Sequence, residues 1–337
     1  MRPQSEPVRV ARSADPVAAF LDAHEAGALV ALPTSGSSSQ PRTVVRSTAS
    51  WVRSFPHVEA LTGLSPSSRV WVPGPLSSTM NLFAAVHARC LGAELVPGAR
   101  DATHAVVTPA ALDRSLPDLA DVVVVVAGDG LSPALHARAT EAGARVCHYY
   151  GAAELSFVAW GPHRDALAPF PGVEVEVRGG EVWVRSAYVC EGYDAASGPL
   201  RFAPDGFATV GDRGRLENGV LTVLGRPDAV TTAGATVWVP DVEALLRPVA
   251  RGEVVVVGAP HERLGAVLSV VLTDAEDLGA VRDRARAVLA GAERPRCWFH
   301  EPKLPLTDAG KVDRKRLADL AGSGDGTGSH DGLRRLS

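Results

Sequence analysis

The chain has 337 residues, of which 46% are hydrophobic, so it can bury a sizeable core and form more than one domain. Its formal net charge of -4 comes from interspersed acidic and basic residues without a basic stripe, a composition that argues against nucleic acid as a partner. Charges and prolines occupy residues 1–11, where a signal peptide needs an apolar run, and the apolar stretches are too short to span a bilayer. We therefore expect a cytoplasmic protein without a membrane partner.

The first part of the chain alternates between predicted helices and short apolar strands. Asp15 and Pro16 are typical of the start of a helix, which Gly27 ends, and residues 29–32 are predicted to form a buried strand. Further β-branched runs occupy residues 105–107, 122–127 and 145–148, with helical or loop segments such as 133–142 between them. This alternation predicts a largely parallel sheet covered on both faces.

The second half changes character twice. Residues 173–177, 181–185, 206–210 and 220–224 are predicted as short strands joined by glycine-containing turns, which indicates a β-rich subdomain. A new α+β pattern follows residue 226, with helices predicted over 240–246 and 278–289 and strands over 254–257 and 267–272. The final segment is rich in Gly, Ser and Asp without an apolar period, so we expect residues 321–337 to be a disordered tail.

A stretch rich in hydroxyl side chains, Thr34 to Arg42, directly follows the predicted strand 29–32. Such a backbone can fold around an anion and offer it N–H and O–H donors. The Gly-x-x-x-x-Gly-Lys spacing of a Walker A loop is absent. Taken alone, a serine-rich stretch is more often a plain flexible loop.

The segment Tyr150 to Glu154 follows the predicted strand 145–148, and parallel sheets place their ligands at the carboxyl ends of their strands. An aromatic ring there can stack on adenine, and a carboxylate four residues on can hold the Mg²⁺ that neutralises a triphosphate. Taken alone, the same five residues are more often a surface turn.

Two patterns in the second half carry charged groups. Asp212 stands in Thr-Val-Gly-Asp-Arg-Gly, and the two oxygens of its carboxylate suit a vicinal diol; Gly225 and Arg226 close the hairpin that follows. Lys311 stands in the segment Leu304 to Arg314. A lysine presented on a loop can place a point charge where negative charge concentrates during attack at phosphorus.

In this order the four motifs resemble those of the AMP-forming adenylating superfamily of acyl-CoA synthetases, luciferases and carrier-loading adenylation domains, and the short chain is similar to the o-succinylbenzoate-CoA ligases. The resemblance covers about Leu29 to Leu317. It implies an acyl-CoA synthetase-like α/β fold. Residues 1–227 would form a large nucleotide- and acyl-binding domain, N-terminally shortened, with mixed or parallel sheets and the β-rich subdomain. Residues 228–320 would form a small mobile α+β domain that carries the catalytic lysine.

The resemblance also implies roles for individual residues. Tyr150 would line the adenine, Asp212 would accept the ribose hydroxyls and Glu154 would bind Mg²⁺. Asp228 falls at the hinge about which the C-terminal domain swings between an adenylate-forming and a thioester-forming pose. The full nucleotide-binding set is Thr34, Ser35, Gly36, Ser37, Ser38, Arg42, Tyr150, Gly151, Ala153, Asp212, Arg226 and Lys311, and the catalytic set is Lys311, Glu154 and Arg226.

The implied chemistry uses ATP, Mg²⁺ and CoA. A small-molecule carboxylate attacks the α-phosphorus of Mg-ATP to give an acyl-adenylate and pyrophosphate, and the thiol of CoA then displaces AMP. Positioning and charge neutralisation catalyse the first step, so no side-chain nucleophile is required.

Several positions depart from the family's pattern. Ser39 replaces a glycine and Arg42 a lysine in the phosphate loop, and Ala153 replaces a threonine. Ser77 and Ser78 stand where many relatives carry an aromatic-histidine pair that gates the acyl pocket, and Ala235 stands where CoA-using members tend to have glycine.

Three interpretations therefore stay open. The first is an acid:CoA ligase, and the second is an adenylating enzyme that hands the acyl group to an acyl or peptidyl carrier protein or to an amine. The third is a non-catalytic relative that binds nucleotide without turnover. We expect the chain to form a homodimer if the short N-terminal side exposes an apolar surface.

Overall fold

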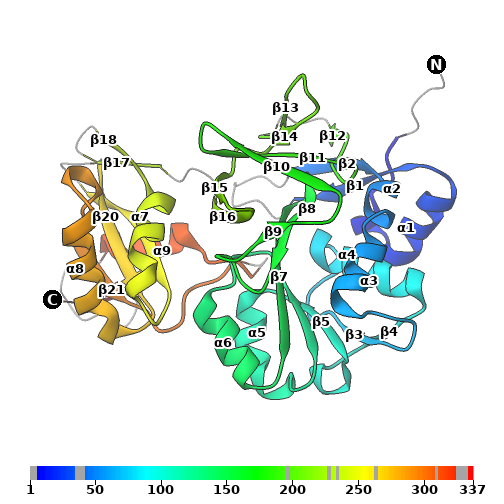
Figure 1. Cartoon of the computed structure of the whole chain (residues 1–337), viewed down its shortest axis with the longest axis horizontal. Helices are drawn as coiled ribbons and strands as arrows, with labels where there is room; N and C mark the ends of the chain where they lie inside the picture. The colour runs from blue at the N-terminus through cyan, green and yellow to red at the C-terminus, as the bar shows by residue number, and fades with distance from the viewer. Residues whose placement is uncertain are drawn as a thin grey trace. The chain divides into compact units, whose positions relative to one another are not determined.

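A computed structural model describes residues 6–34, 42–194, 198–225, 229–232, 235–261, 265–307, 310–323 and 333–336 (Figure 1). The chain divides into two compact units, Met1–Val223 and Leu224–Ser337. Among the described residues, none of the helices has the length and apolar character that crossing a bilayer requires.

The first unit is built on a mixed seven-stranded sheet with the order β4-β3-β5-β6-β7-β8-β9. Its strands are β3 (Arg69–Trp71), β4 (Glu94–Val96), β5 (His104–Val107), β6 (Val123–Val126), β7 (Arg145–Ala152), β8 (Ser156–Gly161) and β9 (Ala168–Pro169). Pairing is parallel from β4 to β7 and antiparallel from β7 to β9. All four residues of β6 are buried, as expected for a strand covered on both faces. The predicted sheet is confirmed.

Helices flank and connect these strands (Figure 1), and several begin where the sequence supplies a cap. They are α1 (Pro16–Glu25), α2 (Ala49–Val52), α3 (Phe55–Thr62), α4 (Thr79–Leu91), α5 (Pro109–Ser115) and α6 (Pro133–Glu141). The side chain of Asp15 accepts hydrogen bonds from the first turn of α1, and Thr108 and Ser132 do the same for α5 and α6. A proline follows each cap, where its missing N–H costs nothing.

A small sheet holds the two ends of the serine-rich segment. Its order is β1-β2-β12, with β1 (Leu29–Pro33), β2 (Thr43–Ser47) and β12 (Gly192–Tyr193). Strands β1 and β2 pair antiparallel, with Pro33 opposite Thr43. Strand β12 adds to the other edge of β2, so that Tyr193 lies opposite Val44.

A second antiparallel sheet confirms the β-rich part of the sequence. It contains β10 (Val173–Arg178), β11 (Glu181–Ser186), β13 (Arg201–Phe202), β14 (Ala208–Thr209), β15 (Arg213–Glu217) and β16 (Val220–Gly225). The turn between β10 and β11 is Gly179–Gly180, with φ of +58° and +82°, the left-handed values that a tight two-residue hairpin requires. The strand predicted over 206–210 is shorter than expected, because only Ala208–Thr209 pair with neighbours.

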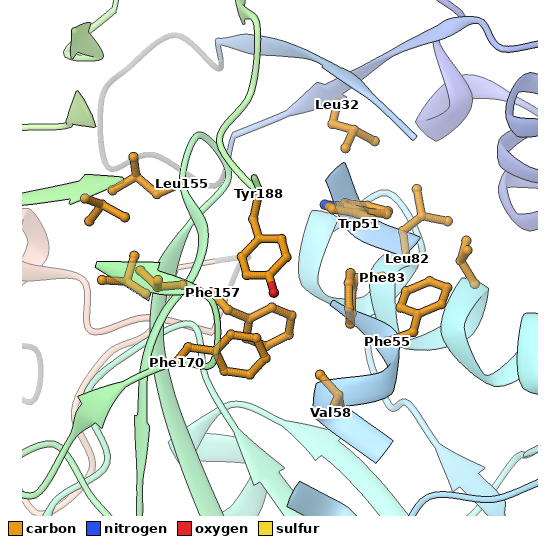
Figure 2. Packing of buried hydrophobic residues seen from close by; sticks show 14 of the residues in the cluster. Leu32, Trp51, Phe55, Val58, Leu82, Phe83, Leu155, Phe157, Phe170 and Tyr188 are labelled. Atoms are coloured by element: carbon orange, nitrogen blue, oxygen red, sulfur yellow. The ribbon is translucent and has the colours of Figure 1, made fainter. Parts of the chain in front are cut away.

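Aromatic side chains join the helices of the first unit to its strands. Figure 2 shows Trp51, Phe55 and Phe83, from α2, α3 and α4, opposite Phe157 and Phe170. The ring of Phe83 lies 5.1 Å from that of Phe157, edge to face, and Phe157 stacks on Phe170 at 4.7 Å. This packing fixes α4 against the β7–β8 hairpin.

The second unit is a sheet with helices on both faces. Its elements are β17 (Ala229–Thr232), β18 (Ala235–Trp238), α7 (Val239–Leu246), β19 (Val254–His261), β20 (Gly265–Leu272), α8 (Leu278–Val288), β21 (Cys297–His300), α9 (Arg314–Ser323) and β22 (Arg334–Arg335). Along β19, Val254 and Val256 pack with α7 and α8, whereas Val255 and Val257 pack with α9. The alternation is that of a strand buried on both faces.

The predicted tail, residues 321–337, differs from the structure at 321–323, which end helix α9, and at 333–336. Leu333 is buried among the residues that pack with α9, and Arg334–Arg335 form β22, which pairs antiparallel with β21. The low apolar content of the preceding residues hides this short strand from a composition argument. Short 3₁₀ turns occupy Val10–Arg12, Ala99–Asp101, Leu116–Asp118, Arg247–Val249, Ala275–Asp277 and Gly291–Glu293.

Candidate active site

An aromatic ring and a carboxylate meet at the carboxyl end of β7. The hydroxyl of Tyr150 donates a hydrogen bond of 2.7 Å to Oδ2 of Asp212, which lies in the turn between β14 and β15. Asp212 is buried, and Gly211 before it has a φ of +79°, a left-handed value that glycine adopts without steric penalty. The residues predicted for adenine and ribose are thus in direct contact.

The turn from β7 to β8 requires glycine at position 151. The register of the two strands shifts between Tyr150 and Gly151, as at a β-bulge. A Cβ on Gly151 would lie 2.2 Å from the carbonyl oxygen of Ser156, so any side chain would force the hairpin apart. Ala153 and Glu154 follow in the connection between the strands, where Leu155 N–H bonds back to the carbonyl of Ala152.

Glu154 is almost completely buried, and it accepts hydrogen bonds from a residue of β12 and from a residue just before β12. Its Oε1 accepts a hydrogen bond of 2.8 Å from the hydroxyl of Tyr193, and its backbone carbonyl accepts one of 2.8 Å from the N–H of Cys190. The same Tyr193 hydroxyl accepts from the N–H of Leu200 at 3.3 Å. Burial, followed by the hydrogen bond to Glu154, raises the pKa of Tyr193, so the phenol stays protonated and donates to the carboxylate.

Arg46 brings a positive charge into the same region. It is fully buried on β2, where Nη2 donates to the carbonyl of Tyr188 at 2.8 Å. Within the described part of the chain, its Nε and Nη1 have no hydrogen-bond partner. Burial lowers the pKa of Arg46 to about 10, although the charges of Cys190, Glu154 and Glu191 oppose this shift. The guanidinium therefore stays protonated at neutral pH and balances acidic groups that include Glu154.

The serine-rich segment is described only at its ends. The N–H of Thr34 donates to the carbonyl of Arg42 at 2.8 Å, and the N–H of Arg42 donates to the Thr34 hydroxyl at 3.3 Å. Thr79, at the start of α4, bonds the carbonyl of Pro33 at 2.7 Å. These contacts close the base of the segment. Ser35, Gly36, Ser37, Ser38 and Ser39 lie outside the described residues.

Lys311, in the second unit, stands in a tight turn between β21 and α9. The N–H of Thr307 donates to the Lys311 carbonyl at 2.8 Å, and the Lys311 N–H donates to the Thr307 hydroxyl at 3.3 Å. Gly310 has a φ of +76°, which places it in the left-handed region, and its N–H bonds the Thr307 carbonyl at 2.8 Å. The turn presents the lysine at a defined position within its unit.

Three residues after Lys311, Arg314 forms a buried ion pair that fixes the end of this turn. The guanidinium of Arg314 donates to both carboxylate oxygens of Glu243 on α7, at 2.5 and 3.0 Å. Glu243 is 1% exposed and also accepts from Arg247 at 2.5 Å and from the N–H of Val256 at 2.8 Å. The bidentate geometry gives both energy and orientation, so the start of α9 is fixed against α7 and β19.

Two other predicted positions, Arg226 and the hinge residue Asp228, lie outside the described residues. Ala235 begins β18. Among the described side chains, no group of three or more His, Cys, Asp or Glu could hold a metal ion. A single carboxylate such as Glu154 nevertheless fits Mg²⁺, because this ion is usually bound by one or two carboxylates together with substrate phosphates and water.

Sequence reasoning missed Arg46 and Tyr193. In β2 the burial alternates, and Arg46 stands at an inward position four residues after the end of the segment Thr34 to Arg42, where a charged residue is unusual. A charged residue at a position predicted to face the core could have identified Arg46 as a candidate site residue. Tyr193 offered none, since its contact with Glu154 depends on the pairing of β12 with β2, in which Gly192 lies opposite Val45, 147 positions earlier in the chain.

No family model matches the chain. An uncharacterised acyl-CoA ligase of Bacillus subtilis is 26% identical over 324 residues, which cover 84% of this chain and 67% of the relative. A probable 2-succinylbenzoate-CoA ligase of Mycobacterium tuberculosis is 35% identical over 223 residues, which cover 63% of this chain and 56% of the relative. The chain therefore matches between about half and two thirds of the length of these relatives.

Among solved structures, a variant of Escherichia coli MenE with bound OSB-AMS has a TM-score of 0.71 and 24% identity, covering 87% of this chain and 68% of that one. The expected acyl-CoA synthetase-like α/β fold is confirmed. The sequence matches to acyl-CoA ligases, together with this fold, confirm the resemblance of the chain to the AMP-forming adenylating superfamily.

Proposed function

We propose that the chain is an AMP-forming acid:CoA ligase, which activates a carboxylic acid with Mg-ATP to an acyl-adenylate and transfers the acyl group to CoA. The observation that carries this proposal is the contact of Tyr150 with Asp212 beside the buried carboxylate of Glu154. An aromatic face, a diol-binding carboxylate and a metal-binding carboxylate are the groups that a nucleoside triphosphate needs. The names of the relatives support the choice of acid and CoA as the other substrates.

In this proposal each residue has one task. Tyr150, with Gly151 and Ala153, lines the adenine, and Asp212 accepts the ribose hydroxyls. The segment Thr34 to Arg42 surrounds the phosphates, and Arg42 supplies a forked cation in place of lysine. Glu154 would hold Mg²⁺, which neutralises phosphate charge when bound. Arg226 would contact ribose and phosphate.

The reaction has two steps. A carboxylate oxygen forms a bond to the α-phosphorus while the bond to the bridging oxygen of pyrophosphate breaks, and pyrophosphate leaves with its electron pair. The ammonium of Lys311 stabilises the charge that builds up between carboxylate and phosphate. The sulfur of CoA then attacks the acyl carbon and AMP departs. A swing of residues 228–320 about Asp228 would exchange the two poses.

The proposal also specifies CoA as the molecule that accepts the acyl group. Ala235 replaces a glycine at a position beside the thiol path in the resemblance, which keeps a carrier protein or an amine as the second candidate. A nucleotide-binding relative without turnover is the third.

Pyrophosphate release from Mg-ATP across a panel of carboxylic acids, with and without CoA, tests the proposal. Acid-dependent release that turns over repeatedly only when CoA is present supports the ligase. Release that stops after one turnover despite CoA favours a carrier protein or amine as acceptor. Nucleotide binding without release for any acid would overturn adenylation.

The hydroxyl of Tyr150 gives a first prediction. Replacement of Tyr150 by phenylalanine should raise KM for ATP about 3- to 10-fold with a small change in kcat, because it removes one hydrogen bond that orients Asp212, worth about 1 kcal/mol. ATP-dependent pyrophosphate exchange measures both constants. Tyr188→Phe is the matched control, since its hydroxyl bonds the Pro171 carbonyl instead. An unchanged KM in Tyr150→Phe would mean that Asp212 needs no such support.

The hydroxyl of Tyr193 gives a second prediction. Tyr193→Phe should raise the Mg²⁺ concentration for half-maximal exchange about tenfold, because a group that orients a metal-binding carboxylate typically matters by that factor. The titration is run at saturating ATP, and Mn²⁺ binding to the enzyme–nucleotide complex, followed by electron paramagnetic resonance, gives a readout independent of turnover. Equal metal dependence in the variant and in the original chain would contradict a positioning role.

A further inference from the structure

The guanidinium of Arg46 is a buried cation whose hydrogen bonds are incomplete. The side chain is fully buried on β2, where Val30 of β1 lies opposite in register. Its Nη2 donates to the carbonyl of Tyr188 at 2.8 Å, whereas Nε and Nη1 have no partner among the described residues. The guanidinium carbon lies 5.6 Å from the ring centre of Trp51. A charge buried in this way is strongly unfavourable unless an opposite charge lies nearby.

Three acidic groups act on Arg46 electrostatically, and Glu154 is the buried carboxylate among them. Glu191 is exposed, so water screens its charge. Cys190 carries a thiol that is neutral at pH 7, because burial raises its pKa to about 11. Glu154, in contrast, is 3% exposed. Its carboxylate therefore supplies the opposite charge that stabilises the buried guanidinium.

The chain around β12 holds these two charges close to one another but out of direct contact. The carbonyl of Tyr188 accepts from Arg46, and two residues later the N–H of Cys190 donates to the backbone carbonyl of Glu154 at 2.8 Å. The hydroxyl of Tyr193 donates to Oε1 of Glu154 at 2.8 Å. Arg46 itself donates to neither carboxylate oxygen of Glu154. The guanidinium thus balances the charge of Glu154 without occupying the atoms that a metal ion would bind.

A fixed positive charge beside Glu154 acts on a free metal ion and on a nucleotide in opposite directions. It repels a divalent cation that approaches the carboxylate alone. It attracts the complex of Mg²⁺ with ATP, because that complex carries a net negative charge. Strand β2, which carries Arg46, begins at Thr43, directly after the segment proposed to surround the phosphates. The charge of Arg46 is therefore placed to influence the order in which metal and nucleotide bind.

We propose that Arg46 is a positioning residue that balances the charge of Glu154 while the nucleotide site is empty, so that Mg²⁺ enters together with ATP and not ahead of it. The inference rests on the proposed function, in which Glu154 holds the metal ion. It predicts that loss of the Arg46 charge strengthens the binding of metal alone and weakens the binding of Mg-ATP. A side chain that only supported the fold would weaken both.

Binding of Mn²⁺ to the nucleotide-free chain, followed by electron paramagnetic resonance, tests the first of these effects. Arg46→Met should bind Mn²⁺ about tenfold more tightly than the original chain, because a repelling charge is removed. The gain should vanish in the double variant Arg46→Met with Glu154→Gln. Arg53→Met, which removes an exposed arginine of the same unit, is the matched control and should leave the affinity unchanged. Equal Mn²⁺ affinity in Arg46→Met and the original chain would overturn the inference.

Calorimetric titration with Mg-ATP tests the second effect. Arg46→Met should bind Mg-ATP about 3- to 10-fold more weakly, because an attracting charge is lost. Arg46→Lys keeps the charge and should hold both affinities within about twofold of the original values. Weaker binding of both Mn²⁺ and Mg-ATP by Arg46→Met would assign the side chain to the structure of the sheet and reject the proposed role.

Thermal unfolding without any ligand serves if Arg46→Met does not fold. Glu154→Gln keeps a hydrogen-bond acceptor for Tyr193 but removes the charge that balances Arg46, so it should lower the melting temperature. The double variant Arg46→Met with Glu154→Gln should unfold at a higher temperature than Arg46→Met alone, or fold where Arg46→Met does not. An unchanged melting temperature in Glu154→Gln would show that the two charges are not coupled and would contradict the inference.

None of these measurements needs turnover, so failure of the inference and failure of the proposed function can be distinguished. If no acid supports pyrophosphate exchange but Arg46→Met shows the two opposite changes in affinity, adenylation fails and the role of Arg46 in metal and nucleotide binding stands. If exchange is normal but Mn²⁺ binds equally to Arg46→Met and the original chain, adenylation stands and the inference fails.

Discussion

Replacement of Lys311 by alanine is expected to lower the rate of acyl-adenylate formation by about 10²–10³-fold, the order of effect found when one donor to a charged transition state is removed. The lysine stands in a turn whose backbone hydrogen bonds involve Thr307 and Gly310, and the alanine variant can keep these bonds while it loses the charge. Pyrophosphate exchange with a substrate acid measures the loss.

The second half-reaction provides the decisive comparison. When a preformed acyl-adenylate and CoA are supplied, Lys311→Ala should form the thioester at close to the original rate, because charge no longer develops at the α-phosphorus in attack on the acyl carbon. Lys303→Ala, at an exposed position in the same unit, controls for loss of any lysine. Equal slowing of both half-reactions would assign Lys311 to the structure of the turn rather than to the charge at phosphorus.

Replacement of Arg314 by methionine is expected to destabilise the second unit by about 3–5 kcal/mol, because it removes the principal partner of a buried carboxylate. Glu243 would keep Arg247 and the N–H of Val256 but lose both hydrogen bonds from Arg314. Urea unfolding followed through Trp298, which packs in the core of this unit, measures the change. Arg316→Met, at an exposed position on the same helix, is the matched control.

The ion pair of Arg314 with Glu243 also predicts how the stability of the second unit changes with pH. The positive charges of Arg314 and Arg247 outweigh the effect of burial and lower the pKa of Glu243 below its usual 4.5. A carboxyl with a lowered folded pKa contributes stability above its unfolded pKa, and the contribution is lost as pH falls through the folded value. The original chain should therefore lose stability below about pH 4.5, and Arg314→Met should lose less over the same range. The double variant Arg314→Met with Glu243→Leu should recover part of the stability, and no recovery would contradict the buried-pair account.

Local signals in the sequence predicted the elements of this fold well. Asp15 with Pro16 marks the start of α1, and the valine runs mark β6 and β19, because caps and hydrophobic period act over a few residues. Strand β22 escaped prediction, since its pairing with β21 places Arg335 opposite Phe299, 36 positions earlier in the chain. Short strands owe their existence to such distant partners rather than to their own composition.

For the candidate site, too, the sequence predicted the residues but not their contacts. Tyr150, Glu154 and Asp212 could be assigned through resemblance to a family, but nothing local predicts that the phenol of one bonds the carboxylate of another 62 residues later. The contact of Tyr193 with Glu154 likewise follows from strand pairing. Side chains that act together in a site are brought together by tertiary structure, so residue type alone identifies candidates and leaves their contacts open.

Strand β22 has a consequence for the solubility of shortened chains. It pairs with Phe299 and His300, and so occupies the free edge of β21. An unpaired edge presents a row of N–H and C=O groups to which another chain can add a strand. A chain cut before Leu333 would uncover that edge together with the apolar surface that Leu333 covers, and self-association through β21 would follow.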